Sequence, residues 1–156
     1  MGIALPGTVV QRAANASGAV ATGTTIVPGD DTIPQNTEGD QYMSQAITPT
    51  SAANVLRISH QGSYSYSAAN NQLATGLFQD STANALAVST QNYGSAANYM
   101  TGIVNYAMVA GTVSSTTMKI RAGGQSAGTT SFNGNSGARQ YGGVLDSYLE
   151  ILEIAA

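Results

Sequence analysis

Apolar and polar residues alternate with a period of two along several short stretches of the chain. In the stretch 54–60, NVLRISH, Leu56 and Ile58 fall on one side, whereas Arg57 falls on the other. The stretch 115–122, STTMKIRA, repeats the pattern, with Met and Ile on one side and Lys and Arg on the other. Because a β-strand points successive side chains to opposite faces, both stretches predict strands with one buried face.

Four further stretches have strand-like patterns: 41–48, 72–80, 101–110 and 143–154. The stretch 101–110, TGIVNYAMVA, is nearly all apolar, which predicts a strand covered on both faces. The stretch 143–154, GVLDSYLEILEI, fits both helical and period-two spacing. Because it follows Gly142-Gly143 and has no N-cap residue before it, we expect a strand there as well.

Turn signals built from Gly, Pro and Asn separate these stretches at short intervals, and Ser-Ala-Ala-Asn occurs at 51–54, 67–70 and 95–98. Asn after small residues suits a turn that leads into a strand. The regular spacing predicts an all-β fold, an antiparallel sandwich or barrel. We assign residues 24–156 to one sandwich domain. Residues 1–23, rich in Gly, Ala, Ser and Thr, are expected to form an extended N-terminal arm that can add a strand to another subunit.

The strand phases also predict the residues of the core. These are Ile47, Leu56, Ile58, Leu77, Phe78, Ile103, Val104, Met118, Ile120, Leu149 and Ile151.

Charge is scarce in this chain of 156 residues. Charged side chains make up 8%, against about 25% in a typical globular protein. Five basic residues face eight acidic ones, for a net charge of −3. Nucleic-acid binding needs clustered Lys and Arg, and an anionic membrane surface attracts the same residues, so we expect neither partner. The chain has no cysteine, so it can form neither a disulfide nor a thiolate site.

Few residues could carry out catalysis. His60 is the only histidine, and it lies in phase with Leu56 and Ile58, which predicts a buried structural histidine rather than a catalytic base. We therefore expect no enzymatic activity and no cofactor.

Half of the acidic side chains lie in residues 29–42, GDDTIPQNTEGDQY, namely Asp30, Asp31, Glu38 and Asp40. Carboxylates are calcium ligands, but the spacing is not that of an EF-hand loop. We interpret the segment as a charged connection and keep the four residues as weak candidate calcium ligands.

Two segments, 61–72 (QGSYSYSAANNQ) and 91–99 (QNYGSAANY), are rich in Tyr, Ser, Gly and Asn. The same residues dominate antibody-type binding loops, where Tyr supplies rigid contact area. The candidate contact residues for a receptor or partner are Tyr64, Tyr66, Tyr93 and Tyr99. The alternative is that these tyrosines pack on their own strands.

From about Gly18 to Ile154 the chain resembles small structural proteins and fibre-type modules of tailed bacteriophages. The segments that carry the resemblance best are DTIPQNTEGDQ at 31–41 and GGVLDSYLEILEI at 142–154. The resemblance implies a virion-associated, jelly-roll-like sandwich, commonly a homotrimer, with no catalytic residues to assign. It also implies that the last segment is a closing strand.

Two functions are compatible with this resemblance. The first is a virion structural protein that decorates or cements the capsid, or forms a head knob or fibre, through contacts with its own copies and the major capsid protein. The second is a receptor-binding module that docks on tail fibre proteins and recognises a host surface glycan. The opening residues, MGIALPGTVVQR, carry no basic and apolar signal pattern, so we expect assembly in the bacterial cytoplasm and release by lysis.

Overall fold

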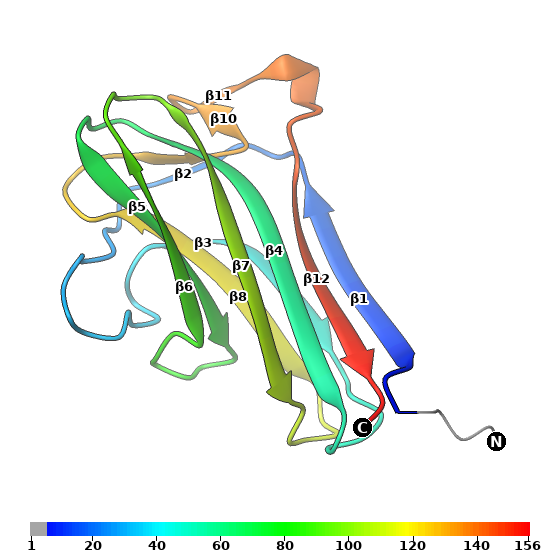
Figure 1. Ribbon diagram of the computed structural model, residues 1–156. Coiled ribbons are helices and arrows are strands. Elements are labelled where there is room, and N and C mark those ends of the chain that lie inside the picture. The colour runs from blue at the N-terminus through cyan, green and yellow to red at the C-terminus, as the bar shows by residue number, and fades with distance from the viewer. Residues whose placement is uncertain (1–5) are drawn as a thin grey trace.

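The computed structural model describes residues 6–156, which form two antiparallel sheets packed face to face (Figure 1). In chain order the elements are β1 (Val9–Ser17), β2 (Ala21–Gly23), β3 (Asp40–Ile47), β4 (Val55–Tyr66), β5 (Asn71–Gln79), β6 (Ala87–Tyr93), β7 (Tyr99–Val109), β8 (Thr116–Gly124), β9 (Thr130–Phe132), β10 (Gly134–Asn135), β11 (Ala138–Arg139), the 3-10 turn η1 (Tyr141–Gly143) and β12 (Ser147–Ile154). This is the predicted all-β, jelly-roll-like fold.

The larger sheet is organised around β4. Its strand order is β1-β12-β4-β9-β2, and β7 pairs with the other side of β4. At twelve residues, β4 is long enough for two neighbours on one side: β12 pairs with it from Val55 to Gln61, and β9 pairs with Tyr64 to Tyr66. The second sheet has the order β3-β8-β5-β6, and β10 and β11 form a separate short hairpin.

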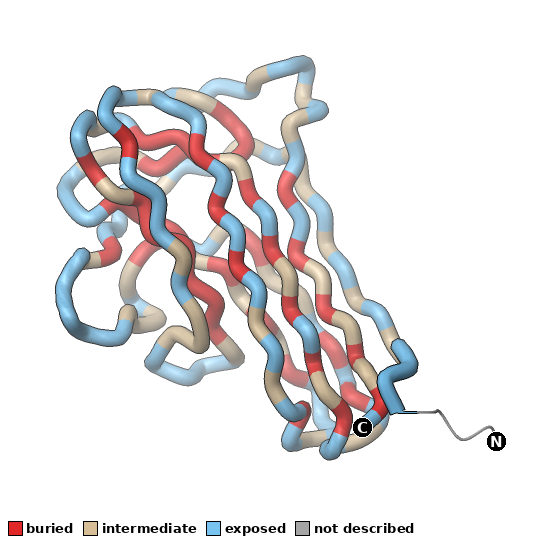
Figure 2. The backbone as a smooth tube through the Cα atoms, in the orientation of Figure 1, coloured by how far each residue is buried: buried red, intermediate tan, exposed pale blue. Residues whose placement is uncertain are grey.

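Between the two sheets lies a core that follows the period-two pattern of the sequence. Figure 2 shows buried and exposed positions alternating along the strands of the larger sheet. In β4 and β12 the predicted inward residues Leu56, Ile58, Leu149 and Ile151 are buried, and Arg57 is exposed as its phase predicts. Regular alternation therefore identified the inner face of both central strands.

Ten of the eleven predicted core residues are buried, and the prediction was wrong for Ile103. In β7 every second residue faces outward, and Ile103 and Val109 are 50% and 59% exposed. The strand covered on both faces is instead β5, where Leu77 and Phe78 point to opposite faces and are both buried. Within residues 6–156, no layer lies over the apolar outer face of β7.

The connection between β2 and β3, residues 24–39, lies against the outer face of the second sheet (Figure 1). The Asn36 amide donates to the Ala83 carbonyl, and the Ala85 amide donates to the Pro34 carbonyl. A further bond joins the Val27 amide to the Gly124 carbonyl. These bonds anchor the connection to the β5–β6 turn and to the end of β8.

The last segment is β12, and the strand prediction for it is confirmed. Each Ser-Ala-Ala-Asn copy forms a turn or bend directly before a strand, leading into β4, β5 and β7 respectively. Turn chemistry and strand periodicity therefore agree along most of the chain.

The predicted N-terminal arm, residues 1–23, needs correction. Within its described part, Val9–Ser17 forms β1, which pairs with β12 of the same chain, and Ala21–Gly23 forms β2, which pairs with β9. Residues 1–5 of the predicted arm lie outside the described residues. Small Ala and Ser side chains in this segment suit an edge strand as well as an arm, so composition alone could not separate the two.

Candidate interaction surface

Three of the four candidate contact tyrosines are buried, which contradicts their proposed role as surface contacts. Tyr64 and Tyr66 lie on the inner face of β4, and Tyr93 ends β6 with its ring in the core. Burial raises the pKa of the Tyr93 hydroxyl to about 12. The sequence did carry a signal for this: Gly62-Ser63-Tyr64-Ser65-Tyr66 continues the alternation of the preceding stretch.

Only Tyr99, at the start of β7, is exposed among the four, at 41%. It lies beside Tyr141 of η1, which is 69% exposed and which the sequence pattern did not identify. The two ring centroids are 6.2 Å apart with a tilt of 46°. Tyr141 has a φ of 48°, a left-handed conformation that is uncommon for residues other than glycine.

The acidic segment does not assemble a metal site. Asp30 accepts hydrogen bonds from the amide and hydroxyl of Thr32, which lower the pKa of the Asp30 carboxyl. Glu38 accepts from the Gln35 amide at 2.9 Å, and Asp40 accepts from Thr25. Among residues 6–156, no three His, Cys, Asp or Glu side chains cluster closely enough to hold a metal ion. Asp30, Glu38 and Asp40 are therefore separate loop caps, and the Asp31 carboxylate makes no hydrogen bond with any of residues 6–156.

His60 is buried on the inner face of β4, as its phase predicted. Its Nδ1 lies 2.7 Å from the Tyr148 carbonyl oxygen, so Nδ1 carries the proton of the neutral ring, and Nε2 lies 3.1 Å from the Tyr64 hydroxyl. Burial lowers the pKa of His60 to about 4, partly offset by the bond to the Tyr148 carbonyl. Both ring nitrogens are occupied within the core, so His60 holds strands together.

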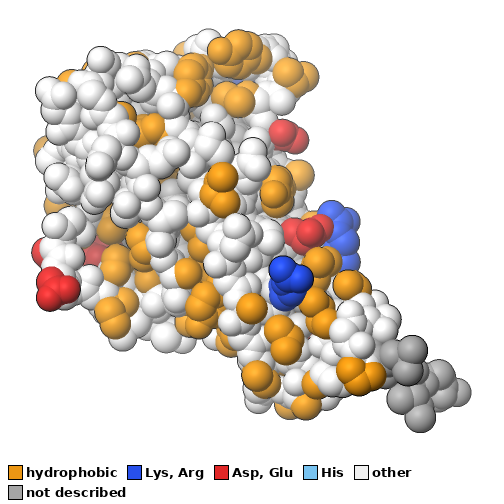
Figure 3. Space-filling model, viewed as in Figure 1, with side chains coloured by type: hydrophobic (Ala, Val, Ile, Leu, Met, Phe, Trp, Pro, Cys, Tyr) orange, Lys and Arg blue, Asp and Glu red, His pale blue; other side chains and the backbone are white. Residues whose placement is uncertain are grey.

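Among residues 6–156, no other element lies over the outer face of β1, β12, β4 and β7 in the larger sheet. Register places the outward residues of four strands side by side, in the row Ala16–Tyr148–Gln61–Ile103 and the row Arg12–Leu152–Arg57–Ala107. Figure 3 shows hydrophobic side chains over this face among small polar ones, with few charges. Such a mixed, charge-poor surface is suited to contact with another protein.

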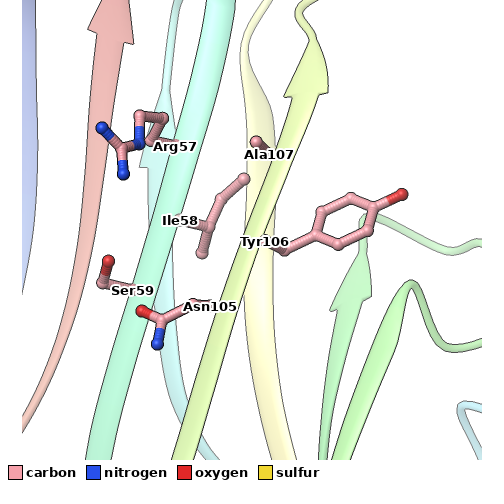
Figure 4. A pocket seen from close by; sticks show the side chains of 6 residues that line it. All are labelled: Arg57, Ile58, Ser59, Asn105, Tyr106 and Ala107. Atoms are coloured by element: carbon pink, nitrogen blue, oxygen red, sulfur yellow. The ribbon is translucent and has the colours of Figure 1, made fainter.

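A shallow hollow lies on this face between β4 and β7 (Figure 4). It has a volume of about 240 Å³ and is lined by Arg57, Ile58, Ser59, Asn105, Tyr106 and Ala107. The side chains of Ser59 and Ala107 are small, which leaves the space open beside the longer Arg57 side chain. In Figure 4 the Tyr106 ring points away from Arg57 and Ser59.

The charges on this face are not balanced. Arg12 at the sheet edge forms an ion pair with Glu150 of β12. Arg57, on the neighbouring strand, has no ion pair and no side-chain hydrogen bond to any described residue. The hollow therefore presents an unpaired guanidinium beside small and apolar side chains.

In residues 6–156 the structure has no helix of the length and apolar character needed to cross a membrane.

Comparison with known proteins identifies the fold but no family. No protein-family model matches the chain, and no curated protein sequence matches it. Over 92% of both chains, the structure is similar to Eiger TNF from S. frugiperda, with a TM-score of 0.53 and 10% sequence identity. At that identity the likeness shows a shared jelly-roll-like fold.

Viral proteins are also among the structural neighbours. One is the VP2 subviral particle of infectious bursal disease virus, with a TM-score of 0.39, 11% identity, and 96% of this chain matched to 38% of that one. Another is the enzymatically active domain of tailspike protein 4 of bacteriophage CBA120, with a TM-score of 0.30, 12% identity, and 81% of this chain matched to 19% of that one. At TM-scores below 0.5, neither assigns a function to this chain.

Proposed function

We propose that this chain is a structural protein of a bacteriophage particle, which decorates or cements the capsid through contacts with its own copies and with the major capsid protein. The observation that carries the proposal is the uncovered outer face of β1, β12, β4 and β7. Ile103, Val109 and Tyr148 project from a rigid sheet there, with few charges among them. The resemblance of residues 31–41 and 142–154 to phage structural proteins supplies the setting.

A structural role also agrees with how the polar groups are used. His60 is enclosed by the core, and the carboxylates of Asp30, Glu38 and Asp40 cap local backbone or side-chain groups. Groups that act in catalysis need to converge on a space that a substrate can enter. We therefore propose a protein that acts by adhesion, without enzymatic activity.

The test is the position of the protein in the virus particle, determined by cryo-electron microscopy. We expect density for this fold on the capsid lattice, in a fixed number of copies per capsomer. Density only on the tail would contradict the capsid role, and a particle without the protein would contradict the virion role.

A receptor-binding role is the second candidate, and it now depends on the exposed pair Tyr99 and Tyr141. Two neighbouring exposed rings provide a rigid surface on which a ligand can pack at low conformational cost. Replacing both with alanine should abolish adsorption to host cells if this role holds. Unchanged adsorption of the double variant would contradict it.

A further inference from the structure

Most charged side chains of this chain make an ion pair or a hydrogen bond within residues 6–156, and four do not. Lys119 donates to the Asp80 carbonyl, Arg121 donates to the Glu38 and Gly39 carbonyls, and Asp80 accepts from Thr116 and Thr117. Within residues 6–156, the charged side chains with neither an ion pair nor a side-chain hydrogen bond are Asp31, Arg57, Arg139 and Asp146.

Asp31 lies in the β2–β3 connection, in the sequence Asp30-Asp31-Thr32-Ile33. Ile33 is 56% exposed, so an apolar side chain projects from the connection next to free negative charge. The backbone there is held in place, because the Pro34 carbonyl accepts from the Ala85 amide at 2.9 Å and the Asp30 carboxylate accepts from Thr32. We call Asp31 to Ile33 the acidic tip.

The hollow at Arg57 has the complementary character. It combines a free positive charge with the small side chains of Ser59 and Ala107, and Ile103 and Val109 lie along the same face of β7. The acidic tip therefore matches it in charge, and the projecting Ile33 matches the depression and its apolar border.

The two features lie on different sides of the molecule. The acidic tip belongs to the connection that lies over the outer face of the β3-β8-β5-β6 sheet (Figure 1). The hollow opens between β4 and β7, on the outer face of the other sheet (Figure 4). One copy cannot bring its own tip to its own hollow. A contact between tip and hollow requires a second copy.

We infer that copies of this chain associate head to tail, with the acidic tip of one copy seated in the Arg57 hollow of the next. Asp31 of one copy pairs with Arg57 of its neighbour, and Ile33 packs against the apolar side chains of β7. Unlike patches that pair in this way generate a closed ring when the rotation between copies closes. The inference rests on the proposed function, since it specifies the contact between its copies.

The experiment measures self-association of the purified chain by sedimentation velocity and light scattering over a concentration series. The wild type should form a species whose mass is a fixed multiple of the 15.8 kDa chain mass. Arg57→Glu alone and Asp31→Arg alone should each weaken association by about tenfold or more, because each places like charges against one another. The double variant restores opposite charges and should recover most of the association.

Matched controls are Arg139→Glu and Asp146→Arg, which change the two other free charges by the same amount. Both should associate like the wild type, and circular dichroism should show that every variant is folded. The inference is overturned if the wild type remains at 15.8 kDa at every concentration. It is also overturned if the double variant is no better than the singles, or if Asp146→Arg weakens association as Asp31→Arg does. Because particle location is measured separately, a monomeric protein found on the capsid would refute the contact but not the virion role.

Discussion

His60 should make the stability of this protein depend on pH in a range where few other groups titrate. In the unfolded chain its pKa is near 6.5, whereas burial in the folded core lowers the pKa to about 4. Between these two values the unfolded chain binds a proton that the folded chain excludes. Stability from this group is therefore fully present above pH 6.5 and is lost as the pH falls toward 4.

The pKa change gives the size of the effect. A shift from 6.5 to about 4 corresponds to about 3 kcal/mol in total, of which about 2 kcal/mol is lost between pH 7 and pH 5. Most carboxylates of the unfolded chain are still ionised at pH 5, so this window isolates the histidine. The geometry agrees with the sign, because a second proton on Nε2 would meet the Tyr64 hydroxyl instead of an acidic partner.

The assay is urea unfolding of the wild type and the His60→Asn variant at half-unit steps from pH 7 to pH 5. Asn can still donate to the Tyr148 carbonyl, so the variant should fold with reduced stability but without the slope. Tyr64→Phe is the matched control: it removes the hydroxyl but keeps the buried imidazole, so its slope should persist. A flat wild-type profile, or parallel profiles for wild type and His60→Asn, would refute this account.

Three further changes test other parts of the structure. Glu153→Gln should cost about 2 kcal/mol at pH 7: burial alone would raise the pKa of this carboxylate, but the hydrogen bonds that it accepts from Thr50, Ser51 and Asn54 outweigh burial and keep the pKa low. The cost, measured by chemical denaturation, should shrink as the pH falls and the wild-type carboxylate protonates. Leu56→Ala removes a buried side chain and should lower the free energy of unfolding by about 2–5 kcal/mol, whereas Ile103→Ala removes an exposed one and should change it by less than about 0.5 kcal/mol in the monomeric chain. Equal losses of stability would mean that the inner and outer faces of β4 and β7 are misassigned. Gly62→Ala should lower the melting temperature and reduce the free energy of unfolding by about 1–3 kcal/mol, because the added Cβ would lie 2.7 Å from His60 Nε2. An unchanged melting temperature would contradict the close packing of His60 against Gly62.

Local periodicity determined much of the fold. Alternation at 54–60, 115–122 and 143–154 is a property of each stretch by itself, because successive side chains of a strand face opposite ways. It predicted the strands β4, β8 and β12 and their buried faces, Leu56 and Ile58 among them. The buried state of His60 followed from the same phase.

Other features depended on which strands become neighbours. The nearly all-apolar stretch 101–110 predicts a strand covered on both faces, yet β7 lies at a sheet edge with its outer face exposed. The β2–β3 connection covers the outer face of the other sheet instead. Tyr64 and Tyr66 have the composition of a binding loop, but β4 continues through them, and they meet β9 and the core. Composition describes a segment's chemistry, whereas burial depends on the partner that packs against it.

The candidate surface shows the same division. The sequence predicted that Arg57 points away from the core, because its phase is opposite to that of Leu56. The sequence could not show that Arg57 lies beside Ala107 at the rim of a hollow, or that Asp31 lies on the other side of the molecule. These relations join residues about 50 and 26 positions apart in the chain, and only the pairing and packing of the sheets determines them.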